Sequence, residues 1–164
     1  MVIVIAGPPC AGKSTIAEEA ARKLGIPHLS MDATRQRILP GAAHTRADRR
    51  IAYRAMLMAA ELLHKAGAGV ILDAPYGHEE DRAAFAGLEP LWVECKVSPD
   101  EAVRRLRIRG FDPERPDLTE ELVRRSAEEY RYSRGIVLDT EALPAGECIE
   151  RVVNEGLSRL ARRK

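Results

Sequence analysis

The stretch Gly7-Pro8-Pro9-Cys10-Ala11-Gly12-Lys13-Ser14 decides the fold, because it has the form G-x-x-x-x-G-K-S. An apolar, β-branched run at residues 2–6 precedes this stretch, and a helical pattern at residues 13–24 follows it. Glycines in such a loop let the backbone curl until its N–H groups face inward and cradle phosphates. Lys13 would then reach the β- and γ-phosphates, and Ser14 would offer its hydroxyl to Mg²⁺. The sequence therefore predicts a strand–loop–helix unit that binds a nucleoside triphosphate.

Strand candidates alternate with helical patterns along the rest of the chain. Further strands are expected at residues 28–30, 70–72, 91–97 and 136–138, and helices at about 33–39, 46–65, 78–86, 99–109, 119–132 and 146–162. Alternation of this kind indicates βαβ crossovers. We therefore expect one α/β domain over residues 1–164, with a five-stranded parallel sheet and helices on both faces. Residues 110–117 contain two prolines and a glycine, so they cannot be helical and would belong to a small lid at about residues 104–120.

Composition narrows the classes of function. The chain has 164 residues and nearly balanced charges, with 26 Lys+Arg and 25 Asp+Glu, which argues against a dedicated nucleic-acid or membrane surface. Its one Trp, four Tyr and two Phe leave little material for stacking bases. Three widely spaced cysteines fit a reducing cytoplasm, and no apolar run approaches the length of a membrane span. We expect a cytoplasmic protein without a membrane partner.

Two acids follow strand candidates at the edge where open α/β sheets bind ligands. Asp73 ends the apolar run at residues 70–72, and an acid there can hold Mg²⁺ directly or through water. Asp32 would face the γ-phosphate and accept a proton from an attacking hydroxyl; its alternative role is an N-cap of the next helix. Arg35, one turn further on, would hold the transferred phosphate or an anionic group of the acceptor, or would lie on a solvated helix face.

Four arginines, at positions 104, 105, 107 and 109, come just before the Pro-rich segment. Arg105 and Arg109 are four residues apart and share a helix face, so their charges repel unless an anion lies between them. A bound triphosphate would be that anion, and the pair would stabilise the charge of the transition state. A solvated face is the alternative, and Arg115 is a further candidate. The expected nucleotide contacts are Gly7, Pro8, Pro9, Cys10, Ala11, Gly12, Lys13, Ser14, Thr15, Arg105 and Arg109.

Together these residues resemble the P-loop kinases of the polynucleotide 5′-kinase, chloramphenicol phosphotransferase and zeta-toxin group. The resemblance covers about residues 1–140, and residues 32–38 (DATRQRI) and 104–110 (RRLRIRG) are most similar to the polynucleotide kinases. The matching positions are Lys13, Ser14, Asp32, Arg35, Asp73, Arg105 and Arg109. The resemblance implies a P-loop NTPase fold, Asp32 as the general base and lid arginines that clamp ATP. In that group the segment after the second strand, here residues 40–53, and the loop after the third strand, here residues 74–82, vary.

The sequence thus predicts a kinase that uses ATP and Mg²⁺ and transfers the γ-phosphoryl group to a hydroxyl of a small molecule. The predicted catalytic residues are Lys13, Asp32, Arg105 and Arg109. Ser14 and Asp73 would hold the metal ion. Asp32, Arg35, Tyr76 and Arg82 would contact the acceptor, the last two from the loop after the third strand.

Two alternatives stay open at this stage. One is a polynucleotide 5′-hydroxyl kinase, in which Arg46, Arg49, Arg50 and Arg54 would form a local phosphate track or else a solvated helix face. The other is a nucleotide-binding regulatory module without turnover. The sequence also leaves open whether Asp32 or Asp73 is the base, which nucleoside triphosphate is preferred, and the oligomeric state.

Overall fold

The computed structural model describes residues 1–113 and 115–162, so Glu114 of the predicted lid and residues 163–164 of the predicted domain lie outside the described residues. Within these ranges five parallel strands form one sheet in the order β2-β3-β1-β4-β5. The strands are β1 (Val2–Ala6), β2 (His28–Ser30), β3 (Val70–Asp73), β4 (Leu91–Lys96) and β5 (Ile136–Asp139). The predicted five-stranded parallel sheet is therefore confirmed.

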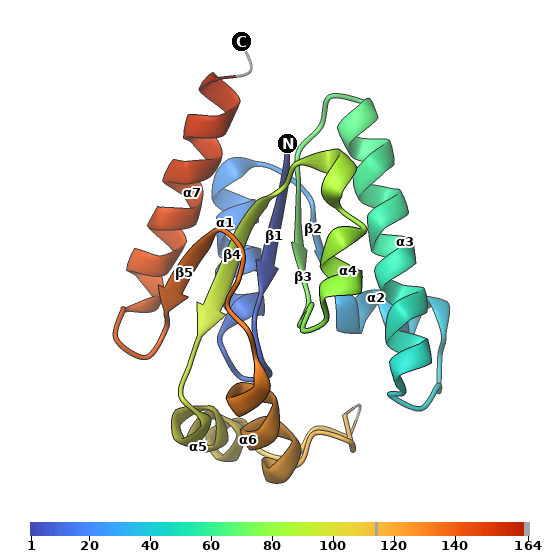
Figure 1. Cartoon of the computed structure of the whole chain (residues 1–164), viewed down its shortest axis with the longest axis vertical. Helices are drawn as coiled ribbons and strands as arrows, with labels where there is room; N and C mark the ends of the chain where they lie inside the picture. The colour runs from blue at the N-terminus through green and yellow to red at the C-terminus, as the bar shows by residue number, and fades with distance from the viewer. Residues whose placement is uncertain (114, 163–164) are drawn as a thin grey trace.

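Helices cover both faces of this sheet, as Figure 1 shows. They are α1 (Lys13–Leu24), α2 (Met31–Ile38), α3 (Arg46–Lys65), α4 (Glu79–Ala83), α5 (Pro99–Arg109), α6 (Glu120–Glu129) and α7 (Ala145–Ala161), with a 3₁₀ turn at Ala86–Leu88. Helices α1 and α7 pack on one face of the sheet, and α3 packs on the other. Among the described residues, no helix has the length and apolar character needed to cross a bilayer.

Strand β1 divides the core into two clusters because alternate side chains of a strand point to opposite faces. Ile3 and Ile5 pack with α1 and α7, whereas Val2, Val4 and Ala6 pack with α3 and the aromatic residues that follow β3. All five residues of β1 are buried, as expected of a central parallel strand. The strand that carries the phosphate loop is therefore fixed from both sides.

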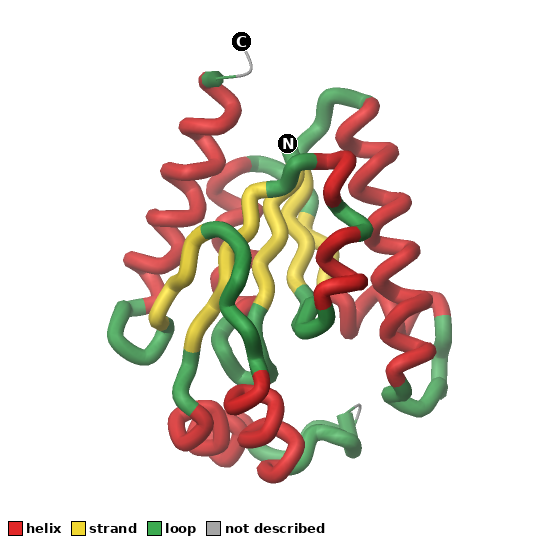
Figure 2. Tube along the Cα trace, viewed as in Figure 1, coloured by secondary structure: helices red, strands yellow, loops and turns green. Residues whose placement is uncertain are grey.

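All strands run in the same direction, so their carboxyl ends meet at one edge of the sheet. Figure 2 shows the loops gathered at this edge, with α5 and α6 beyond it. Helices α5 and α6 begin close to the predicted positions and are capped: Ser98 Oγ accepts from the backbone N–H of Glu101, and Thr119 Oγ1 from that of Leu122. The predicted helix at residues 78–86 is shorter in the structure and continues as the 3₁₀ turn.

Candidate active site

The loop after β1 is held in a backbone conformation that only glycine accepts at one position. Gly7 has φ +147°, and a Cβ atom there would lie 2.5 Å from the carbonyl oxygen of Cys95 on β4. Gly12 has φ +79° and precedes the first turn of α1. The loop therefore closes against the sheet and directs the N-terminus of α1 toward its own interior, an arrangement suited to phosphate.

Lys13 lies inside this loop rather than in solvent. Its side chain is 9% exposed, and Nζ donates a hydrogen bond of 2.7 Å to the carbonyl oxygen of Pro8. Burial lowers the pKa of the Lys13 ammonium, and the nearby charges of Asp73 and Asp32 oppose this shift. The buried ammonium of Lys13, hydrogen-bonded to a carbonyl oxygen, is therefore positioned to bind an anion.

Asp73 ends β3 beside the loop, because the register pairs it with Ile5 of β1. Its Oδ1 accepts a hydrogen bond of 3.1 Å from Ser14 Oγ, and its Oδ2 lies 2.6 Å from Nε2 of His28. His28 was not among the predicted site residues; the available signal was its position at the start of the second strand candidate. Pairing of β2 with β3 brings the imidazole to the carboxylate.

The Ser14 hydroxyl and the Asp73 carboxylate fit a Mg²⁺ ion, since both are hard oxygen donors within hydrogen-bond distance of each other. No group of three or more His, Cys, Asp or Glu side chains suited to a metal ion occurs in residues 1–113 and 115–162. Magnesium in phosphoryl-transfer sites is held by one or two protein ligands together with phosphates and water. The sparse donor set therefore suits an ion that arrives with a nucleotide.

Asp32 lies in the first turn of α2, and Ser30 is the N-cap residue of that helix. The alternative role of Asp32 as an N-cap is therefore wrong. Its Oδ2 accepts a hydrogen bond of 2.7 Å from Nη1 of Arg115, and its Oδ1 is buried without a partner among the described residues. The N-terminal turn of α2 thus presents a carboxylate to the same space that Lys13 lines.

Arg115 connects the lid to this carboxylate. Besides Asp32, it pairs with Asp117, whose Oδ1 lies 3.4 Å from Nδ1 of His44. Hydrogen bonds from Arg115 keep the pKa of Asp117 below its ordinary value, although burial opposes this effect. Arg115 was predicted only as a further candidate, and nothing in the local sequence pattern indicated its contact with Asp32, 83 residues away.

The predicted lid arginines reach the loop from α5. Arg105 donates to the carbonyl oxygen of Cys10 at 3.4 Å and to the Oγ1 and carbonyl oxygen of Thr140 at 3.0 and 2.6 Å. Hydrogen bonds from Arg104 and Arg105 lower the pKa of Glu101 to about 2, so this carboxylate stays charged and offsets them. Arg109 pairs with Asp112 at 2.9 Å. The positive charges of Arg105 and Arg109, which were expected to be balanced by a bound anion, are therefore also paired with the carboxylates of Glu101 and Asp112.

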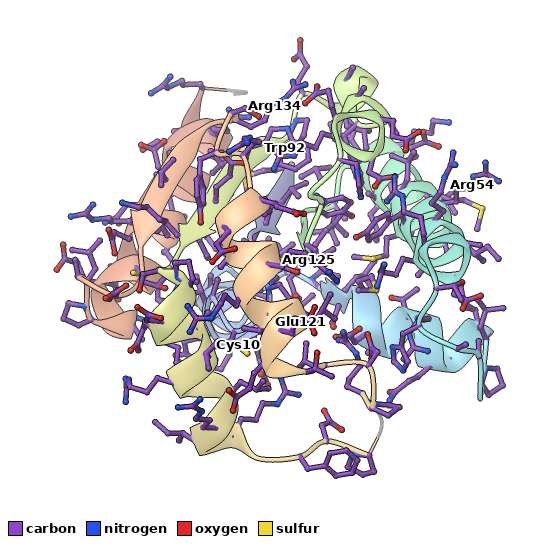
Figure 3. The ribbon with its side chains drawn as sticks, turned by 60° about the horizontal axis from the view of Figure 1, so that its bottom comes forward. Cys10, Arg54, Trp92, Glu121, Arg125 and Arg134 are labelled. Carbon is purple, nitrogen blue, oxygen red and sulfur yellow. The ribbon has the colours of Figure 1, made fainter. Side chains whose placement is uncertain are left out.

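These groups surround one cavity of about 240 Å³ at the sheet edge. Its lining includes Pro9, Cys10, Gly12, Lys13, Ser14, Thr15, Asp32, Asp73, Arg105, Arg109 and Arg115. Figure 3 brings this edge forward. Cys10 of the loop is labelled there, behind α5 and α6 and in front of the sheet. The loop, both acids and both lid arginines are therefore together in one place.

Two predicted acceptor contacts lie elsewhere. Tyr76 is fully buried, and its ring stacks 4.8 Å from that of Tyr53. Arg82 is 3% exposed; it donates to the carbonyl oxygen of Tyr76 and to Ser133 Oγ, and its Nη1 lies 2.9 Å from Oε1 of Glu94. Tyr76 and Arg82 are core residues that hold the loop after β3, and the prediction that they contact the acceptor is corrected.

Arg35 is also buried, at 3% exposure. Its Nη1 donates a long bond of 3.4 Å to the carbonyl oxygen of Ala42, and its Nε has no partner among the described residues. No carboxylate lies within 4.0 Å of its guanidinium in that part of the chain. Arg35 therefore lies inside the protein, one turn after Asp32, rather than on a solvated helix face.

A central strand that leads into a G-x-x-x-x-G-K-S loop, with an acid on the next strand and an arginine-bearing lid, defines the P-loop kinase class. A model of the family described as "AAA domain" matches residues 2–132. The chain belongs to this family of P-loop kinases.

Curated relatives and solved structures agree with this assignment. The chain is 33% identical over 149 residues to a protein of Mycolicibacterium smegmatis named adenylate kinase, covering 80% of each sequence. The adenylate kinase of Mycolicibacterium paratuberculosis is 32% identical over 157 residues, covering 85% of this chain and 84% of that one. A gluconokinase structure from Sinorhizobium meliloti has a TM-score of 0.72 at 22% identity, covering 99% of this chain and 94% of that one, and shares the fold.

Proposed function

We propose that this protein transfers the γ-phosphoryl group of ATP to a hydroxyl of a small molecule, with Mg²⁺. The observation that carries the proposal is the presence of Asp32 and Lys13 in the lining of one cavity. The Oδ1 atom of Asp32 is buried and has no partner in the described part of the chain. A buried carboxylate oxygen without a donor is suited to accept the proton of an incoming hydroxyl.

The loop would bind the donor. Its inward N–H groups and the N-terminus of α1 would hold the β- and γ-phosphates, and the ammonium of Lys13 would exchange the carbonyl of Pro8 for a phosphate oxygen. Ser14 and Asp73 would hold the Mg²⁺ ion. The bound ion would neutralise developing charge on the phosphate oxygens. His28 would keep the Asp73 carboxylate oriented through its 2.6 Å contact.

The chemical step would be an in-line displacement. The acceptor oxygen forms a bond to the γ-phosphorus, the bond from that phosphorus to the β–γ bridging oxygen breaks, and ADP leaves. The hydroxyl proton passes to Asp32, for which Arg115 must release the carboxylate or move with it. Arg105 and Arg109 line the same cavity and would stabilise the negative charge of the transferred group.

A base beside the γ-phosphate favours an alcohol as acceptor. A hydroxyl must lose a proton during transfer, whereas a phosphate acceptor is already ionised at neutral pH. The curated relatives are named adenylate kinases, so a nucleoside monophosphate is the competing acceptor class. The product distinguishes the two acceptor classes, because an alcohol yields a phosphomonoester and a nucleoside monophosphate yields a diphosphate.

A nucleic-acid acceptor has less support. Of the arginines proposed as a phosphate track, Arg46 pairs with Glu80 and Asp81, and Arg50 lies 4.0 Å from Glu80. Arg54 lies on the outer side of α3, away from the loop (Figure 3). A strand-tracking groove needs unpaired cations in a row.

The test is transfer from labelled ATP to a panel of sugars, sugar acids, nucleosides and nucleoside monophosphates, with products identified by phosphorus NMR. We expect one alcohol to gain label and Asp32→Asn to lower kcat about 100-fold or more with nearly unchanged ATP affinity. Asp100→Asn, an exposed acid on α5, is the matched control and should retain full activity.

Two outcomes would reject the proposal. A diphosphate product would identify a phosphate acceptor instead of an alcohol. Tight ATP binding without transfer to any acceptor, unaffected by Asp32→Asn, would favour a regulatory nucleotide-binding module.

A further inference from the structure

Helix α3 carries an apolar stripe on the side that faces away from the sheet. Ile51, Met58 and Leu62 are 45%, 60% and 61% exposed, and Ala55 lies half-buried between them. The opposite side of the helix packs on the sheet through its buried residues, Ala52, Tyr53, Met56 and Ala60. Figure 1 shows α3 at the margin of the molecule. Single exposed apolar side chains are ordinary, but a continuous row along one helix is typical of a contact surface.

The spacing of this stripe is that of a helix that pairs with another helix. Residues 51, 55, 58 and 62 are separated by four, three and four positions, as the d and a positions of a heptad repeat are. The repeat continues to Asp48 at one end and to Lys65 at the other. The small side chain of Ala55 lets a second helix backbone come close. The apolar stripe therefore fits a second helix better than a flat surface.

Two charged side chains lie on one flank of the stripe. Arg54 and Glu61 are seven residues apart, so each occupies the g position just before an a position of the repeat. In the part of the chain that the structure describes, neither has an ion-pair partner. Arg54 lies on the outer side of α3 in Figure 3. Both charges are therefore available to a group on another molecule.

A second copy of α3 that runs antiparallel to the first matches the apolar residues. A twofold axis across the middle of the stripe brings Ile51 of one copy against Leu62 of the other. The same axis brings Ala55 against Met58, so a small side chain meets a long, flexible one. By symmetry each contact occurs twice. The stripe is therefore complementary to itself, which a twofold contact requires.

The charges on the repeat match only in the antiparallel direction. There Arg54 faces Glu61 of the second copy, and Asp48 shares a layer with Lys65. In a parallel pair Asp48 would face Asp48 of the second copy, and Lys65 would face Lys65. Arg54 would then face Ala59, which offers no charge. Opposite charges stabilise a helix pair and like charges oppose it, so the charge pattern selects the antiparallel arrangement.

We propose that this protein forms a twofold dimer through α3, with the two helices antiparallel and a second copy of the chain covering the apolar stripe. The contact spans about three helical turns on each copy. Its area is therefore at the low end for a specific interface, below about 1,200 Å² in total. We expect a dissociation constant of about 10–100 µM. None of the four stripe residues lines the cavity that holds Lys13, so the dimer does not depend on the proposed reaction.

Sedimentation equilibrium of the full chain at about 5–500 µM measures the association. The weight-average mass should rise from that of one chain toward twice that value. Leu62→Lys should raise the dissociation constant about 30-fold or more, because symmetry removes the leucine from both ends of the contact. Leu157→Lys makes the same change at a leucine of similar exposure on α7, and should keep the dissociation constant within about twofold.

Charge-reversal variants test the antiparallel arrangement. Arg54→Glu puts two acids on the flank of each copy and Glu61→Arg puts two bases there, so each variant alone should bind itself about tenfold more weakly. In an equal mixture the two variants should recover the dissociation constant of the unmodified protein, because every flanking pair then joins opposite charges.

Three results would overturn the inference. The mass of a single chain at every concentration would mean that something other than a second copy covers the stripe. An equal loss of association in Leu62→Lys and Leu157→Lys, or a loss in neither, would place the contact elsewhere. Unchanged association of each charge-reversal variant, or no recovery in their mixture, would exclude the antiparallel pair.

Discussion

Arg82 illustrates how a single residue can be polar, charged and structural at once. The guanidinium of Arg82 is buried against Glu94 of β4, which is itself fully buried. The Cζ atom of Arg82 lies 5.2 Å from the ring centroid of Tyr130. It also donates to Ser133 Oγ and to the carbonyl oxygen of Arg131. One side chain thereby ties α4, β4 and the segment after α6 together.

Arg82→Gln should lower the free energy of unfolding by about 3–5 kcal/mol, because Glu94 would keep a buried charge without its partner. The double variant Arg82→Met with Glu94→Leu should recover part of this loss, since no charge then remains unpaired. Urea denaturation of the single and double variants measures both effects. A loss below about 1 kcal/mol for Arg82→Gln would show that the pair does not stabilise the fold.

The residues that could be predicted are those whose chemistry depends on short spacing. The positions of Lys13, Ser14 and Asp73 follow from a loop and a strand end that are local in sequence. Tyr76 and Arg82 were misassigned because the local sequence after the third strand gives no sign of the aromatic cluster and the buried carboxylate that receive them. The contact of Arg115 with Asp32 depends on tertiary packing and has no local signal.

At the level of the elements, the segment predicted to be a lid, at about residues 104–120, comprises the second half of α5, the connection after it and the start of α6. Helices α5 and α6 pack together at the carboxyl edge of the sheet (Figure 1). Arg105 joins α5 to the loop and to Thr140, whereas Arg115 joins the connection to α2 through Asp32. The contact with Asp32 therefore holds the lid against the carboxylate that the proposed reaction needs.

Arg115→Gln should loosen this connection in the free protein. Because the pair is partly buried, we expect amide hydrogen exchange at residues 115–119 to become about fivefold faster, while amides in the middle of α5 keep their protection. Hydrogen exchange followed by NMR measures the change. Arg124→Gln removes the exposed pair with Asp100 and serves as the control; equal exchange in all three proteins would mean that Arg115 does not restrain the lid.

Element boundaries were predictable where capping chemistry is written in the sequence. Ser98 and Thr119 cap α5 and α6, which begin within one residue of the predicted starts at residues 99 and 119. The start of α2 was misplaced by two residues, because Ser30 caps it without a side-chain hydrogen bond and the helix follows β2 directly. Strand order could not be predicted in the same way, since the sequence gives the strands but not their lateral neighbours.

For the molecule as a whole, the central position of β1 links the nucleotide site to global stability. The strand is buried on both faces, and the loop that follows it is closed against β4 at Gly7. A ligand that binds the folded loop and not the unfolded chain stabilises the entire domain by mass action.

MgATP at 100 times its dissociation constant should therefore stabilise the protein by about 2.7 kcal/mol. Thermal unfolding followed by circular dichroism measures the shift, and EDTA should reduce it because Ser14 and Asp73 would then hold no ion. Lys13→Ala should remove most of the shift. Lys23→Ala, an exposed lysine on the same helix that pairs with Glu150, is the control, and a full shift in Lys13→Ala would contradict the assigned phosphate contact.

The buried Arg82 between α4 and β4 also fixes one end of the predicted lid region. Its hydrogen bonds to the carbonyl oxygen of Arg131 and to the hydroxyl of Ser133 attach the segment after α6 to α4 and β4. Between α5 and α6, Gly110 follows α5 with φ +78°, a backbone conformation that favours glycine. Substitution of Gly110 should strain the backbone after α5, whereas substitution of Ser133 should weaken the attachment of the segment after α6 to Arg82.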